Sequence, residues 1–176
     1  MSIEFNPDDY YDINKSIVIC GAKKPPENPE GRIIEEMKIF VSGLEIPGLS
    51  YRVEDVVSGG LFDRKSSNRC LVLEIAFNQH TMRMLTSVSV MGKAVSIFSY
   101  ESFSPTPSSL DLENGSNTIV EAIAASLSHM EDVEFFLTMD QVFNFVHDSG
   151  VELIRNCSLS TVHVTSVRMG RLLALP

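Results

Sequence analysis

The chain contains no tryptophan, only three cysteines, and no apolar run as long as the roughly 20 residues that a membrane-spanning helix requires. Cys20, Cys70 and Cys157 are widely spaced and form no Cys-x-x-Cys pair, so neither a disulfide framework nor a zinc site of that type is expected. We interpret them as reduced thiols in a cytosolic chain. The N-terminus lacks the basic and apolar regions of a signal peptide, which argues against secretion.

What the chain does contain indicates a folded domain. It has 176 residues, 44% of them hydrophobic, with ten phenylalanines. A chain of this length and composition buries enough apolar surface to fold without metals or disulfides. We therefore predict one compact domain.

Basic side chains are missing from a long internal segment. Between Lys93 and Arg155 there are ten acidic residues and no lysine or arginine, whereas the rest of the chain carries 13 acids and 14 bases. The net charge of −9 therefore belongs almost wholly to this segment. It is interpreted either as a solvated acidic face or as a surface that meets a basic partner. No direct, sequence-specific nucleic-acid binding is expected, and the acidic segment would repel nucleic acid, because phosphate contacts require clustered basic residues.

Motifs of catalysis are also missing. The Gly59-Gly60 pair is not followed by Gly-Lys-Ser/Thr, there is no Gly-x-Ser-x-Gly, and the four histidines are isolated from one another. We predict that the protein is not an enzyme and has no cofactor or metal. A small enzyme whose site is dispersed along the sequence stays an alternative.

Residues 1–32 are predicted to form a flexible N-terminal arm, because they are polar and contain a stretch rich in proline. The apolar run at residues 16–20 is interpreted as an edge strand or as a segment that docks on a neighbouring molecule. The candidate residues for self-association or partner binding in this arm are Tyr10, Tyr11, Ile17, Val18, Pro25, Pro26 and Pro29.

Residues 33–176 are predicted to form a single α+β core, a mostly antiparallel sheet with two or three packed helices. Alternating and β-branched residues predict strands at residues 37–41, 70–77, 84–90, 93–100, 151–155 and 159–168. Helices are predicted at residues 50–60 and after capping boxes at Thr118 and Thr138, the last ending at Gly150. Residues 102–117 are predicted to be a mobile loop.

A second candidate site is a basic contact patch. Its predicted members come from a polar loop and from the C-terminal segment: Arg64, Lys65, Arg69, Arg155, Arg168 and Arg171.

The order of these features resembles the matrix proteins of rhabdoviruses, particularly the short ones of plant-infecting members. The likeness lies in the N-terminal arm, then the predicted strand at residues 37–44, and then the Tyr-x-x-Glu-Asp-Val segment at residues 51–57, interpreted as a helix. The chain departs from animal-virus members in lacking a lysine-rich N-terminus and a Pro-Pro-x-Tyr motif.

The resemblance implies a self-associating structural protein of the virion and the host cytoplasm. Such a protein condenses the nucleocapsid during assembly and budding, and it contacts the inner leaflet of the envelope or a glycoprotein tail peripherally. Its implied partners are further copies of itself and the viral nucleocapsid protein. The alternative is a non-enzymatic cytosolic adaptor or viral accessory protein that binds a host partner through its arm or acidic face.

Overall fold

A computed structural model describes residues 3–5, 10, 12–20, 28–58, 66–104, 119–157 and 161–170. Most of the predicted loop falls outside these residues, since residues 105–117 are not among them, while residues 102–104 belong to a strand. Tyr11, Pro25, Pro26, Arg64, Lys65 and Arg171 likewise lie outside the described residues.

The described chain forms one seven-stranded sheet with the strand order β1-β3-β4-β5-β6-β2-β7. Its central strands are a meander of antiparallel neighbours, and only β1 runs parallel to its neighbour, β3. The strands are β1 (Ile3–Phe5), β2 (Asp12–Cys20), β3 (Ser50–Ser58), β4 (Ser66–Phe77), β5 (His80–Met91), β6 (Ala94–Ser104) and β7 (Thr161–Gly170).

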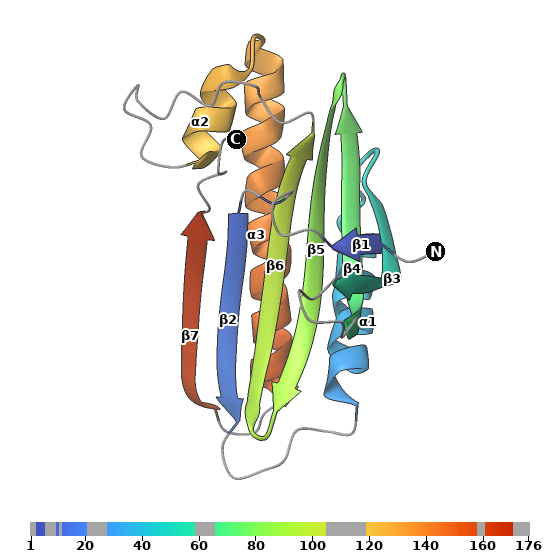
Figure 1. The fold of residues 1–176 in the computed structure, drawn as a ribbon, viewed down its shortest axis with the longest axis vertical. Helices are drawn as coiled ribbons and strands as arrows, with labels where there is room; N and C mark the ends of the chain where they lie inside the picture. The colour runs from blue at the N-terminus through green and yellow to red at the C-terminus, as the bar shows by residue number, and fades with distance from the viewer. Residues whose placement is uncertain are drawn as a thin grey trace.

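The helices are α1 (Pro29–Ser42), α2 (Ile119–Ser126) and α3 (Met130–Cys157). Figure 1 shows α3 behind the long strands, with α1 beside it on the same side of the sheet. The main core lies between this helix layer and the inner face of the sheet, and its largest fully buried side chains include Phe136, Phe143, Met37 and Leu73. The predicted α+β class is confirmed.

The opposite face of the sheet, here called the outer face, carries a second and smaller apolar cluster. It is built on Val56, Cys70, Val72 and Leu85 and is covered by Tyr10. In Figure 1, β1 lies across the long strands rather than along them. The N-terminal residues therefore cover part of the outer face.

The segment predicted as a strand at residues 37–41 is instead the end of helix α1. Asn28 caps this helix by accepting a hydrogen bond from the Gly31 amide, and Pro29 occupies its first turn. The buried residues follow helical spacing from Ile33 to Val41, whereas Ile39 is 64% exposed. The alternation over five residues was too short a pattern to outweigh the 3.6-residue period that begins earlier.

The prediction of a helix at residues 50–60 is also wrong, because residues 50–58 form strand β3. It pairs antiparallel with β4 along its whole length, from Ser50 opposite Glu74 to Ser58 opposite Ser66. Its three valines favour a strand, and the two apparent helix caps did not outweigh that preference.

Residues 130–157 form one helix of 28 residues rather than a helix, a stop and a strand. Thr138, predicted to cap a helix start, lies inside α3 and donates its hydroxyl to the Glu134 carbonyl oxygen at 2.7 Å. Gly150, predicted to end the helix, is buried where α3 meets α1 and the sheet. The predicted strand at residues 151–155 is therefore the last part of α3.

Within the predicted arm, β2 is an internal strand of the sheet. It pairs antiparallel with β6 on one side and with β7 on the other. Ser16 and Val18 are 0% exposed. The prediction of a flexible arm or an edge strand is wrong for this stretch, because the strands that enclose β2 come from much later in the chain.

Candidate functional site

A row of polar side chains is buried between α3 and the inner face of the sheet. His147 is 0% exposed, and each of its ring nitrogens lies 2.8 Å from a serine hydroxyl, Nε2 from Ser16 and Nδ1 from Ser99. The Ser99 hydroxyl also lies 2.9 Å from that of Thr86. Burial lowers the pKa of His147 to about 4, so the imidazole is neutral at physiological pH.

The same row continues one turn earlier along α3. The Asn144 side chain contacts that of Asn14 at 3.2 Å and donates to the backbone carbonyl of Asp140 at 2.7 Å. The row thus joins β2, β5 and β6 to α3 through hydrogen bonds. Because the hydroxyls and imidazole at its centre are fully buried, no substrate reaches them, and we assign the row a structural role.

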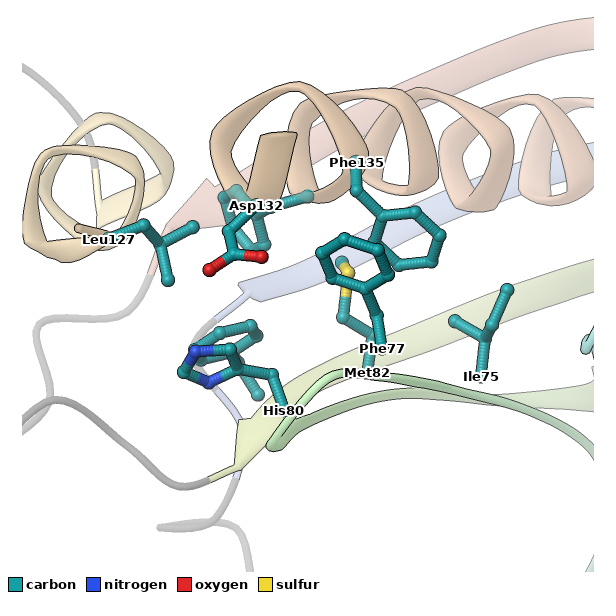
Figure 2. Close-up of a pocket in the computed structure, with 9 residues that line it drawn as sticks. Ile75, Phe77, His80, Met82, Leu127, Asp132 and Phe135 are labelled. Atoms are coloured by element: carbon teal, nitrogen blue, oxygen red, sulfur yellow. The ribbon is translucent and has the colours of Figure 1, made fainter. Parts of the chain in front are cut away.

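A small cavity lies where the start of α3 approaches the β4–β5 turn. Figure 2 shows Asp132 and His80 pointing toward it among apolar side chains. Asp132 accepts a hydrogen bond from the Asn78 amide at 2.7 Å, and the His80 ring stacks on Phe103 at 4.9 Å. The free volume is about 10 Å³, which is room for one water molecule at most. This cavity does not admit an organic substrate.

A larger hollow of about 140 Å³ opens on the outer face. Phe5 and Tyr100 line it and pack edge to face at 4.9 Å, and Tyr10 stacks on Phe5 at 5.0 Å. Cys70 also lines the hollow, and burial, with a smaller contribution from Asp55, raises the pKa of its thiol to about 12. The thiol is therefore protonated at neutral pH and unreactive.

The predicted partner-binding residues of the N-terminus belong largely to the folded core. Tyr10 is 3% exposed in the outer-face cluster, Val18 is buried in the main core, and Ile17 is half-buried in β2. Pro29 opens α1. The described members of this set do not form a projecting arm.

The predicted basic patch is not assembled among its described members. Arg69 on β4 pairs with Glu35 at 3.0 Å, and Arg155 near the end of α3 pairs with Glu152. Arg168 lies in β7, opposite Asn14 of β2. Arg69 and Arg155 are thus each paired with a local acid, and nothing brings them together into one cationic surface.

Strand β7 forms one edge of the sheet. It is ten residues long and pairs with β2 on one side, and among the described residues no strand pairs with its other side. At about 3.4 Å per residue, this edge offers roughly 30 Å of backbone to another strand. The other edge is β1, which has only three residues.

The solvent side of the helix layer carries an apolar surface that the sequence analysis missed. Ile39 of α1 is 64% exposed and Phe145 of α3 is 58% exposed, and the rings of Phe40 and Phe145 are 5.5 Å apart. Exposed Glu36 and Asp148 lie one helical turn away from this contact. We call these five residues the helix patch. Because residues 37–41 were predicted as a strand, no signal in the sequence placed Ile39 of α1 beside Phe145 of α3.

Comparison of the chain with models of protein families, with curated proteins and with solved structures found no match. The described residues contain no helix that is both long and apolar enough to cross a membrane. Within the same part of the chain, no three histidine, cysteine or acidic side chains are grouped so as to hold a metal ion.

Proposed function

We propose that this is a non-enzymatic protein that acts by associating with further copies of itself. The observation that carries the proposal is the open edge of β7. An edge strand of this length presents unpaired N–H and C=O groups that pair readily with another strand. Neither cavity described above offers a catalytic group to a substrate, which favours an assembly role over catalysis.

The simplest pairing is between the β7 strands of two copies. Two identical strands that run antiparallel are related by a two-fold axis, and the pair buries the same edge on both copies. The result is one continuous sheet of two copies. Its ends are the two short β1 strands, which limits growth by further edge pairing.

A narrower proposal is a viral matrix protein that links a nucleocapsid to an envelope. It rests on the sequence resemblance and on the proposed self-association. The helix-then-strand order at residues 29–58 is the reverse of the order that the resemblance implies, so the fold adds no support to it. The alternative of an adaptor that binds a host partner through its acidic face is compatible with the helix patch.

Sedimentation velocity over a range of protein concentrations tests the β7 pairing. Thr165, near the middle of β7, would lie close to its own copy across the two-fold axis, so Thr165→Lys places like charges opposite each other. We expect at least about a tenfold increase in the dimer dissociation constant, equivalent to about 1.4 kcal/mol.

The matched control is Thr161→Lys, at the end of the strand and distant from the axis. It should weaken the dimer much less than the central substitution does. A wild-type chain that stays monomeric at all concentrations, or equal effects of the two lysines, contradicts the proposed pairing.

A further inference from the structure

A dimer closed by a two-fold axis does not grow, so an extended assembly requires a second contact, and a contact between two different surfaces of the chain is one that repeats. The inference below rests on the proposed self-association and names that second contact. One surface is the helix patch, and the other is the turn that joins β5 to β6.

The β5–β6 turn is a small and exposed projection. Met91 ends β5 opposite Ala94 of β6, so only Gly92 and Lys93 separate the two strands. Gly92 has a φ of 61°, as expected for the first central residue of a tight two-residue hairpin turn. Met91 is 81% exposed and Lys93 is also exposed. The turn therefore presents one flexible apolar side chain beside one cation.

The helix patch has the complementary chemistry. Its centre is apolar, with Ile39 and Phe145 both exposed. Its acidic members, Glu36 and Asp148, have no ion-pair partner within the described part of the chain. Burial and the neighbouring Glu152 raise the pKa of Asp148, and Arg155 opposes this only in part. A cation at this site would favour the charged form of Asp148 and would offset the repulsion from Glu152.

The turn does not reach the patch of its own chain. The backbone amide of Val90, next to Met91, donates to Glu30 in the first turn of α1 at 3.1 Å. Ile39 lies nine residues further along α1, which is about 13 Å of helix. In Figure 1 the β5–β6 turn lies at the lower end of the molecule, whereas the middle of the helix layer lies behind the sheet. A contact between turn and patch must therefore join two copies.

We propose that the β5–β6 turn of one copy docks on the helix patch of the next. Met91 covers Ile39 and Phe145, and the Lys93 ammonium pairs with Asp148 and Glu36. Methionine adapts to irregular apolar surfaces, and a charge pair beside an apolar contact fixes orientation and partner choice. Because each copy carries both surfaces at different places, the contact repeats from copy to copy.

Charge exchange between the two surfaces tests this contact by sedimentation velocity at low salt. Lys93→Glu gives an acidic turn that meets an acidic patch, and Asp148→Lys leaves Glu36 in the patch but places a lysine opposite Lys93 of the turn. Each variant alone should form dimers but no larger species, whereas wild type forms larger species. An equimolar mixture should regain them, because the acidic turn of the first variant can pair with the lysine that the second variant carries in its patch. The unchanged basic turn of the second variant likewise fits the unchanged acidic patch of the first.

Phe145→Ser should also reduce the larger species by about tenfold or more, as expected for loss of a central aromatic contact. The control is Glu134→Lys, which makes the same charge change on α3 three turns from Phe145. It should assemble as wild type does. Circular dichroism confirms that each variant is folded.

Three results would overturn the inference. They are a wild-type chain that stops at the dimer, full assembly by either single charge variant, and a mixture that fails to regain the larger species. The β7 proposal is judged separately, since Thr165→Lys acts on the dimer and the charge variants act only on species beyond it.

Discussion

At the scale of single residues, His147 connects the buried polar row to the stability of the protein. Its ring is neutral and fully buried, and both nitrogens are bonded to hydroxyls that come from different strands. If this ring took up a proton, its positive charge would be buried. The hydroxyls bonded to it are neutral and would not balance that charge. The unfolded chain carries the same histidine in water, where protonation is unopposed.

We predict that this difference makes acid destabilise the fold. The pKa of His147 is about 4 in the folded chain and about 6.5 in the unfolded chain. The stabilisation is complete above pH 6.5 and is lost as the pH falls toward 4, because the unfolded state binds the proton first. The pKa difference corresponds to about 3 kcal/mol. Urea unfolding at intervals from pH 7 to pH 4 measures it.

The comparison that isolates this effect is His147→Gln, which keeps a polar side chain but does not titrate. Relative to wild type, it should be less stable at pH 7 and should lose less stability on acidification. His129→Gln, at an exposed position, should follow the wild-type curve. If His147→Gln and wild type lose the same free energy between pH 7 and pH 4, the assignment is contradicted.

The role of His147 was not predictable from the sequence. Its hydroxyl partners lie 131 and 48 residues away, and their positions depend on a strand order that local patterns do not encode. An isolated histidine is interpreted by default as a surface or packed side chain, and only the fold supplies its bonding partners. The charge of Asp148 was equally visible in the sequence, whereas its apolar neighbours across the helix pair were not.

At the scale of elements, local sequence patterns predicted a helix or strand correctly only where the segment fitted one type of structure and not the other. Strands β4, β5 and β6 were predicted because their segments are short, consecutive, rich in apolar and β-branched residues, and joined by tight turns. The order of α1 and β3 was inverted, because short windows around Met37 and Val53 fit both periods. For α3, a capping pattern at Thr138 and a glycine at position 150 imitated a boundary inside a continuous helix.

Gly150 gives a direct test of the α3 packing. A Cβ atom there would lie 2.7 Å from Met37 Sδ and 2.8 Å from Ile97 Cδ1, the ends of two flexible side chains. In Gly150→Ala, the cost of moving them opposes a helix-propensity gain of about 1 kcal/mol, so stability should change by less than about 1 kcal/mol. Gly150→Val adds two more methyl groups and should destabilise by about 1–3 kcal/mol.

Thermal or urea unfolding of the two variants measures these changes. Ser149→Val, at the neighbouring half-buried position, controls for valine in the helix. If Gly150→Val and Ser149→Val cost the same, close packing at position 150 is not the cause.

At the scale of the whole molecule, the N-terminal residues divide into two parts with different roles. β1 and Tyr10 cover the outer face, whereas β2 is inserted between β6 and β7 and contributes Val18 to the main core. Residues 1–32 were predicted to form one flexible arm because they are polar and contain a proline-rich stretch, whereas the strands that enclose β2 lie far away in the chain. Asn14 and Ser16 of β2 belong to the buried polar row, which no pattern in the sequence indicated.

We therefore predict that two N-terminal truncations behave differently. Removal of residues 1–11 deletes Phe5 and Tyr10 but keeps β2, so the protein should fold with about 3 kcal/mol less stability from the lost apolar and ring contacts. Cys70, now 4% exposed, should then be alkylated faster, as mass spectrometry of the labelled peptides would show. Removal of residues 1–27 also deletes β2.

That second truncation leaves β6 paired with β5 alone, detaches β7 from the sheet, and removes the Ser16 partner of His147. It should abolish cooperative unfolding and the dispersed amide signals of a folded chain in NMR spectra. The β7-dependent dimer should disappear with it, because the edge strand no longer has a sheet to extend. A cooperative transition in the shorter chain would show that β2 is not an integral strand, and the removable arm would then be the better description.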